Sequence, residues 1–194
     1  MISEMIEYFY EEGKENIPSG DERGTRMKER NHIIVAGGGA AGMIAAISAA
    51  RLGAEVTLLE RNPRVGKKLL ATGNGRCNFT NIHADAGCYS GNNPKFVYRT
   101  LSAFSPDDAI RFFEGLGIQH KIEDRGKVFP LSDQASGILD VLRYELDATG
   151  VRTVCDAYVR DLEKKKGKFL VRTEDGKTYE GDRVIQQESA FSEM

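Results

Sequence analysis

Six residues early in the chain have the spacing that suits a bound dinucleotide. They read Gly37-Gly38-Gly39-Ala40-Ala41-Gly42, a G-x-G-x-x-G pattern. Gly37 allows a sharp turn, Gly39 lets backbone N–H groups approach a pyrophosphate, and Gly42 removes a Cβ where a helix packs closely on a strand. Glu60 follows 23 residues after Gly37, where a carboxylate can accept hydrogen bonds from an adenosine ribose.

The flanking residues predict the elements that would position this turn. Residues 32–36 read as a buried strand, the apolar run from Ala40 to Leu52 as a helix, and residues 55–60 as a second strand ending on Glu60. A helix N-terminus carries unpaired N–H donors and partial positive charge, so it attracts an anion. The glycine pattern alone is weak, but with the strands, the helix and the acid it favours a dinucleotide.

Composition bounds the remaining possibilities. The 194 residues suffice for one domain, or for one domain and part of a second. A net charge of −2 gives no support for a nucleic-acid or membrane-surface partner, and no run approaches the roughly 20 apolar residues of a membrane helix. Cys77, Cys88 and Cys155 form no C-x-x-C pair and no metal-ligand spacing with the histidines. They indicate reduced thiols, a cytoplasmic location and no disulfide-reductase mechanism.

A polar stretch, residues 66–81, is rich in Gly, Asn and Thr and predicts a loop. Its backbone donors, amides and nearby cations suit a pyrophosphate or the polar edge of a flavin ring, although a solvated surface loop explains the same chemistry. The cations are Arg64, Lys67, Lys68 and Arg76. Arg76 could lower the pKa of the neighbouring Cys77 thiol, but a small buried thiol is the favoured role for Cys77.

Two helices and several strands are predicted further along. One helix begins at the N-cap Ser105 and ends at Gly115 or Gly117, and a second runs from about Ser132 to Thr149. The strands are a third parallel strand at 151–155, an antiparallel meander at 156–163, 168–173 and 178–180, and a last strand beginning at 183–185.

The two ends of the chain differ from the rest. Residues 1–31 lack the basic segment and apolar core of a signal peptide and read as a disordered leader. A short helix at residues 4–12, docked through apolar side chains, is the alternative. Residues 186–194 cut the last strand and read as a separate tail.

Several of these segments together resemble a known family. They are Val35–Gly42, Val56–Glu60, Gly66–Lys68, Lys127–Pro130 and, most specifically, Gly73-Asn-Gly-Arg-Cys-Asn-Phe-Thr-Asn81. With them, residues 32–185 resemble the amino-terminal part of the BaiN-type, aminoacetone-oxidase-like family of NAD(P)/FAD-dependent oxidoreductases. The resemblance implies an α/β, Rossmann-like FAD-binding domain with a parallel sheet and an antiparallel β-meander, incomplete at its C-terminus.

The resemblance also implies FAD as cofactor and a set of binding residues. Gly37, Gly39, Ala40, Ala41 and Gly42 would lie at the pyrophosphate and Glu60 on the ribose. Val159 would contact the adenine through its backbone. Arg61, Lys67, Lys68, Asn74, Gly75, Arg76, Cys77 and Asn78 complete the set, mostly along the flavin side. The longer form of such a protein is expected to use NAD(P)H and a small organic substrate.

The resemblance covers only the first part of the length of the family's members. Its members are roughly twice as long and continue into an Ala-Thr-Gly-Gly turn that touches FAD, a substrate domain and a return segment, so this chain is expected to be truncated. The outer neighbour of the first strand would be missing, which would leave Ile33 to Ala36 as an unpaired apolar edge.

Three interpretations remain open from the sequence. The chain is the FAD-binding portion of an oxidoreductase, a non-catalytic FAD- or ADP-binding fragment, or a Rossmann protein for NAD or S-adenosylmethionine. Glu60 disfavours NADP because it would repel a 2′-phosphate. No His, Cys or acid has a spacing that marks it as catalytic, so activity of the short chain itself stays undecided.

Overall fold

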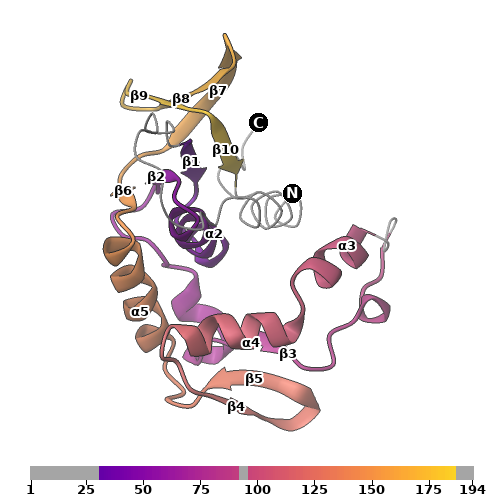
Figure 1. Cartoon of the computed structure of the whole chain (residues 1–194). Coiled ribbons are helices and arrows are strands. Elements are labelled where there is room, and N and C mark those ends of the chain that lie inside the picture. Colours follow the sequence, from indigo (N-terminus) through magenta and orange to yellow (C-terminus); the bar gives the residue numbers. More distant parts are fainter. Residues whose placement is uncertain (1–30, 92–95, 187–194) are drawn as a thin grey trace, which may run out of the picture. The chain divides into compact units, whose positions relative to one another are not determined.

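The computed structural model of the protein describes residues 31–91 and 96–186 (Figure 1). Chain contacts divide them into two compact units: 69–141 is one, and 31–68 with 142–186 is the other. The predicted leader and tail lie outside the described residues, apart from Asn31 and Gln186.

The unit of residues 31–68 and 142–186 is built on a parallel sheet of four strands in the order β10-β1-β2-β6. The strands are β1 (His32–Ala36), β2 (Glu55–Leu59), β6 (Arg152–Val154) and β10 (Arg183–Gln186). All three pairings are parallel. The first two strands and the third parallel strand expected at 151–155 are therefore confirmed.

The prediction of an unpaired edge on β1 is wrong. Residues Ile33 to Ala36 pair in parallel with β10, Ile33 opposite Arg183 and Ala36 opposite Gln186. Asp182, directly before β10, holds this strand beside β1 through two hydrogen bonds to His32. Its carboxylate accepts the His32 N–H at 2.9 Å, and its own N–H donates to the His32 carbonyl at 2.7 Å. The short segment after the meander is enough to supply the missing neighbour.

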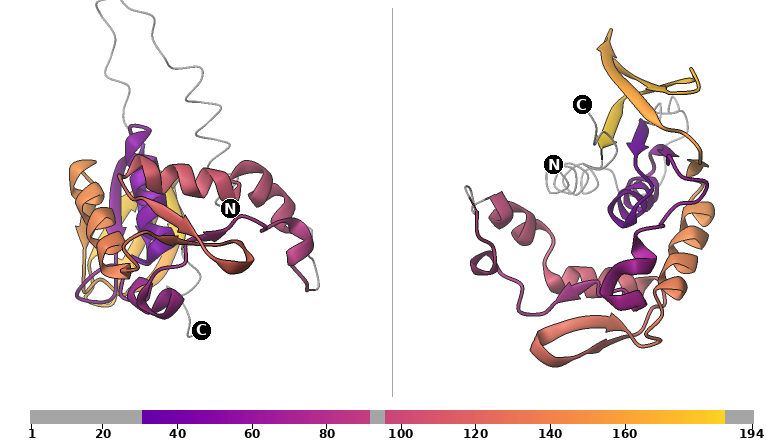
Figure 2. Two further views of the ribbon diagram at one scale, coloured as in Figure 1. Left: turned by 90° about the horizontal axis from the view of Figure 1, so that it is seen from below. Right: turned by 180° about the vertical axis from the view of Figure 1, so that it is seen from behind.

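The two faces of the sheet are covered by different elements (Figure 2). Helix α2 (Ala40–Arg51) packs on β1 and β2 and buries Met43, Ala46 and Ile47 completely. The predicted meander is confirmed and shares a buried cluster with the sheet. Its strands are β7 (Val159–Lys165), β8 (Lys168–Thr173) and β9 (Thr178–Gly181). The alternation of side chains along β1 produces these two layers.

Residues 69–141 contain a small antiparallel sheet in the order β3-β5-β4, formed by β3 (Thr80–Asn81), β4 (His120–Ile122) and β5 (Lys127–Pro130). Around it lie α3 (Phe96–Ala103), α4 (Pro106–Gly115) and three short 3-10 turns, η1 (Leu69–Gly75), η2 (Ala86–Cys88) and η3 (Asp124–Gly126). Helix α4 starts as predicted, because Ser105 and Asp108 form a capping box.

The helix α5 (Ala135–Ala148) starts three residues later than expected and crosses the boundary between the units. Its start is delayed by a turn, in which Asp133 donates its N–H to the Pro130 carbonyl at 3.0 Å. Asp133 also has a left-handed φ of 54°, which is incompatible with a right-handed helix.

Candidate functional site

The glycine turn joins β1 to α2, where the chain leaves the sheet. Gly37 has a φ of 111°, and its N–H donates to the Leu59 carbonyl at 2.8 Å, so the turn starts at the ends of β1 and β2. A Cβ on Gly42 would lie 1.8 Å from the Gly37 carbonyl oxygen and 3.5 Å from Val35. Only glycine fits there, as the packing argument for Gly42 predicted.

The N-terminus of α2 has a chemistry that suits an anion. Gly39 is the N-cap and supplies no side chain, and the first turn contains no acidic residue. Ala40 and Ala41, the first two residues of the helix, are exposed. The first N–H groups of a helix have no partner inside it, so they could donate to a phosphate, and no acid in the first turn of α2 would repel that phosphate.

Glu60 lies next to this turn and is only 7% exposed. Its Oε2 accepts the N–H of Gly38 at 2.7 Å. Its Oε1 accepts the Asn62 backbone N–H at 2.8 Å and the Asn62 side-chain amide at 2.5 Å. A carboxylate offers about four lone-pair positions, so one position on Oε2 remains for a ligand hydroxyl.

Sequence reasoning missed Gly38 and Asn62, which hold Glu60 in place. A Cβ on Gly38 would lie 2.7 Å from Val65 Cγ1 and 2.9 Å from the Glu60 side chain, so no other residue fits. The signal was present, because Gly38 is a glycine at the position between Gly37 and Gly39 where the pattern allows any residue. Asn62 gave no comparable signal, because an amide two residues after a strand usually reads as a turn residue.

Replacing Asn62 with alanine is expected to lower the free energy of unfolding by about 1.5–3 kcal/mol, because a hydrogen bond to a buried carboxylate is lost. Urea denaturation followed by circular dichroism measures this change. Asn31→Ala, at an exposed position before β1, is the control and should stay within about 0.5 kcal/mol of the parent. Equal stabilities of the two variants would show that Asn62 does not support Glu60.

The segment after β2 folds back over the turn. The Gly66 N–H donates to the Gly38 carbonyl at 2.7 Å. Arg61, Lys67 and Lys68, which the resemblance assigns to the cofactor, are exposed on this segment. With the exposed Arg64, the segment of residues 61–68 carries four cationic side chains.

Val159 belongs to the same unit as the glycine turn. It is the first residue of β7, is 5% exposed and precedes a β-bulge between Val159 and Asp161. Just before it, the Ala157 N–H donates to the Glu60 carbonyl at 2.9 Å. The structure therefore brings the start of β7 to the carboxyl end of β2, beside Glu60.

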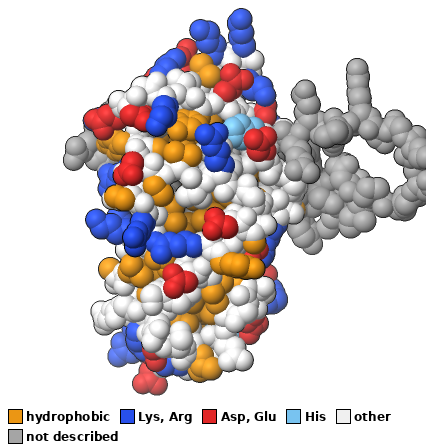
Figure 3. Space-filling view, turned by 90° about the vertical axis from the view of Figure 1, so that its left-hand side faces the viewer, with side chains coloured by type: hydrophobic (Ala, Val, Ile, Leu, Met, Phe, Trp, Pro, Cys, Tyr) orange, Lys and Arg blue, Asp and Glu red, His pale blue; other side chains and the backbone are white. Residues whose placement is uncertain are grey.

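One face of the protein is mixed in charge. On the face shown in Figure 3, Lys and Arg side chains are interspersed with Asp and Glu, and apolar side chains show between them. Several of the charges are paired: Arg172 bridges Asp161 and Glu163 at 2.5 and 2.7 Å on the meander. Such surface pairs contribute little to stability.

Residues 69–81 of the predicted loop lie in the unit of residues 69–141, and residues 73–77 have an unusual backbone. Gly73, Asn74 and Gly75 have left-handed φ values of 56°, 57° and 83°, and Cys77 follows with 62°. A Cβ on Gly73 would lie 2.7 Å from the Asn78 nitrogen. A hydrogen bond of 3.0 Å from the Cys77 N–H to the Thr72 carbonyl closes the loop.

Cys77 is a buried thiol rather than an activated one. It is 5% exposed, and burial raises its pKa above the ordinary value for cysteine. The alternative in which Arg76 lowers the pKa of this thiol is therefore wrong. All three cysteines lie in the described part of the chain and are free of disulfide bonds.

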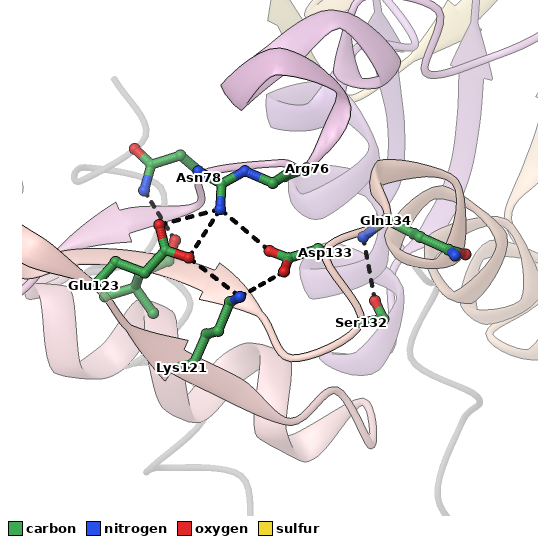
Figure 4. A network of polar contacts seen from close by, with 8 residues as sticks. Arg76, Asn78, Lys121, Glu123, Ser132, Asp133 and Gln134 are labelled. Atoms are coloured by element: carbon green, nitrogen blue, oxygen red, sulfur yellow. Dashed lines mark hydrogen bonds and ion pairs between the residues drawn. The ribbon is translucent and has the colours of Figure 1, made fainter.

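Arg76 and Asn78 point toward the β4–β5 hairpin (Figure 4). The Asn78 amide donates to the Val128 and Thr80 carbonyls, both at 2.9 Å. Arg76 Nη1 donates to the Glu123 carboxylate at 2.8 and 3.1 Å. Asn74 and Gly75, at the tip of the loop, are both exposed.

A cavity of about 320 Å³ opens elsewhere in the unit that holds the glycine turn. It lies between residues 63–65, the end of α5 and β6, and includes Cys155, whose pKa is raised by burial and by Glu60. No predicted cofactor residue lines it. Over residues 31–91 and 96–186 we find no cluster of potential metal ligands. None of the helices in those ranges is long and apolar enough to cross a membrane.

The chain has relatives of known activity. A family model described as the HI0933-like protein Rossmann domain matches residues 31–190. The chain is 42% identical over 157 residues to the 3-dehydro-bile acid delta(4,6)-reductase of Clostridium scindens, an alignment covering 80% of this chain and 38% of that protein. It is 36% identical over 143 residues to the ribosomal RNA dihydrouridine synthase of Escherichia coli, covering 74% of this chain and 36% of that protein.

A solved structure shares the fold. The 3-ketosteroid-delta4-(5alpha)-dehydrogenase of Rhodococcus jostii superposes with a TM-score of 0.59 over 84% of this chain and 47% of that one. At 18% sequence identity this likeness concerns the fold alone. The chain thus spans well under half the length of the curated relatives described above.

Proposed function

The chain belongs to the HI0933-like family of FAD-dependent oxidoreductases, and from this premise we propose that it binds FAD through the turn at Gly37–Gly42 and through Glu60. The observation that carries the proposal is the arrangement at the carboxyl ends of β1 and β2. There an uncapped helix N-terminus and a buried carboxylate are joined through one residue, Gly38.

The pyrophosphate would lie on the N-terminus of α2. Ala40, Ala41 and Gly42 present the first N–H groups of the helix there, and Gly39, the N-cap, adds no side chain. The first turn contains no acid that would oppose the helix dipole. Lys67 and Lys68 are exposed on the segment pinned to Gly38 by Gly66, and they supply further positive charge. Arg61 is exposed directly after Glu60, on the adenosine side.

The ribose would be held by the remaining acceptor position of Glu60. Three of its four positions are occupied by Gly38 and Asn62. A buried carboxylate fixed in this way can accept a hydrogen bond from a ribose hydroxyl without the free-energy cost of reorienting its side chain. The same carboxylate would repel a 2′-phosphate. The adenine would then lie near the backbone of Val159. This residue is the first of β7, which starts beside Glu60 at the carboxyl end of β2.

For the longer protein, we propose reduction of a carbon–carbon double bond conjugated to a carbonyl group. The two relatives described above have activities of this kind: one is a 3-dehydro-bile acid delta(4,6)-reductase and the other a ribosomal RNA dihydrouridine synthase. When bound and reduced, FAD supplies the hydride for such a reaction. The residues of this chain would bind the cofactor and orient it.

Titration calorimetry tests the proposal directly. FAD should bind the purified chain more tightly than NAD or S-adenosylmethionine, because the family to which the chain belongs is FAD-dependent. ADP should retain part of the FAD affinity through the turn and Glu60. Equal affinities for FAD, NAD and S-adenosylmethionine would overturn the assignment of cofactor.

The 194-residue chain alone is expected to show no turnover. A flavin reaction needs the ring held against a substrate and shielded from water, and the chain covers 38% of the reductase it matches. NAD(P)H oxidation by the chain saturated with FAD should equal that of free flavin. Saturable turnover that disappears in Gly39→Val would show instead that the short chain is a complete enzyme.

A further inference from the structure

Arg76 is the centre of a closed network of four charged side chains within residues 69–141 (Figure 4). Its Nη1 contacts Glu123 at 2.8 Å and Asp133 at 3.3 Å. Lys121 completes the ring, with its Nζ 2.5 Å from Asp133 and 3.1 Å from Glu123. Two cations face two anions, so the network is electrically balanced without any ligand.

The guanidinium of Arg76 is also stacked. Its Cζ lies 3.9 Å from the centre of the Phe129 ring, on β5. A guanidinium over an aromatic face adds a cation–π attraction to the ion pairs. Arg76 is therefore held from two directions: by the acids of residues 123 and 133, and by the ring of Phe129.

The chain that follows Arg76 is fastened to the same hairpin. The Phe79 N–H donates to the Val128 carbonyl at 3.1 Å, and the Asn78 amide donates to that carbonyl at 2.9 Å. Before them, the bond from the Cys77 N–H to the Thr72 carbonyl encloses the left-handed residues Gly73 to Gly75. Left-handed backbone at a non-glycine residue such as Asn74 costs free energy, so the surroundings must enforce it.

We infer that Arg76 and Asn78 are positioning residues, which fasten the loop at residues 73–78 to the β4–β5 hairpin, rather than ligands of the cofactor. The inference rests on the proposed function for the claim that this loop serves a flavin. In this arrangement Asn74 and Gly75 remain exposed on the loop, and Glu123, Lys121 and Asp133 act only through Arg76.

The variant Glu123→Gln separates the two roles of Arg76 by the sign of its effect. If Arg76 contacted FAD, removing its anionic partner would release positive charge, and FAD affinity would rise or stay the same. If Arg76 positions the loop, Glu123→Gln should weaken FAD binding roughly fivefold, as should Arg76→Met. The double variant should bind FAD no more weakly than Arg76→Met alone, because both substitutions break the same contact between Arg76 and Glu123.

Hydrogen exchange supplies a readout that needs no cofactor. Protection of the Cys77 and Phe79 amides should fall roughly fivefold in Arg76→Met and in Glu123→Gln, because the loop opens more often. Arg111→Met, which removes the Arg111–Asp108 pair on α4 in the same unit, is the control and should change neither amide. Unfolding by urea shows whether each variant is folded.

The outcomes are distinguishable. Tighter or unchanged FAD binding by Glu123→Gln, with loss in Arg76→Met, would make Arg76 a cofactor ligand and overturn the inference. Unchanged protection of Cys77 and Phe79 in both variants would also overturn it. Failure of the parent chain to bind FAD would refute the proposed function, while the exchange measurement would still decide the positioning role.

Discussion

Replacing Gly42 with alanine is expected to abolish FAD binding and to destabilise the protein by more than about 3 kcal/mol. The added Cβ would lie 1.8 Å from the Gly37 carbonyl oxygen, a backbone atom that no rotamer change can move. Overpacking usually costs about 1–3 kcal/mol, because neighbouring side chains can move aside. The backbone oxygen of Gly37 cannot move aside in this way, so the cost is expected to be higher. Relief requires α2 to shift away from β1, which would displace the N–H groups proposed to bind the pyrophosphate.

Gly137→Ala is the matched control for this variant. Gly137 is also the third residue of its helix, α5, but an added Cβ would meet only Ser132 Oγ at 4.0 Å. Alanine in a helix interior is favoured over glycine by about 0.5–1 kcal/mol, so this control should be slightly more stable than the parent. Urea unfolding and calorimetry with FAD on both variants give the comparison. If Gly42→Ala behaved like Gly137→Ala, the close approach of Gly42 to Gly37 would not exist in solution.

Replacing Glu60 with alanine is expected to lower both stability and FAD affinity. The buried Gly38 N–H would lose its acceptor at 2.7 Å, at a cost of about 1–3 kcal/mol in unfolding free energy. Loss of the ribose contact should cost a further 1.5–3 kcal/mol in binding, roughly ten- to a hundredfold in Kd. Calorimetry must be done well below the midpoint of unfolding, so that the second effect is measured on folded protein.

Glu60→Gln divides these effects. The amide keeps an oxygen for Asn62, but its NH₂ group cannot accept the Gly38 N–H. Stability should therefore fall nearly as far as in the alanine variant. Glu55→Gln, at the exposed start of the same strand, is the control and should match the parent in both measurements. An unchanged FAD affinity in both Glu60 variants would remove this residue from the cofactor site.

Much of the fold was predictable because local signals agreed with the tertiary structure. The strand, turn, helix and strand around Gly37 formed as expected, since buried apolar residues and obligatory glycines allow few alternatives. The start of α5 was misplaced because Ser132 reads as an N-cap, whereas Asp133 adopts a left-handed conformation that only the turn from Pro130 explains. The pairing of β10 with β1 was missed because parallel pairing leaves no signal in the intervening sequence.

The candidate site was predictable where a backbone requirement fixes the residue type. Gly42 is such a case, because its role follows from the space available. Arg76 is the opposite case: its type and its place in a polar loop suit a phosphate, an acid or an aromatic ring equally well. Its partners Glu123 and Asp133 lie 47 and 57 residues away in sequence, and no local pattern connects them.

The pairing of β1 with β10 has a consequence for synthesis on the ribosome. His32 and Asp182 are separated by 150 residues, so at about 5–20 residues per second β1 waits about 8–30 s for its outer partner to emerge. During that interval the nascent chain presents a strand edge of Ile33, Ile34 and Val35, all of which end up buried. The exposed edge that the sequence analysis assigned to the finished protein thus belongs to the growing chain, where a holding chaperone would find it.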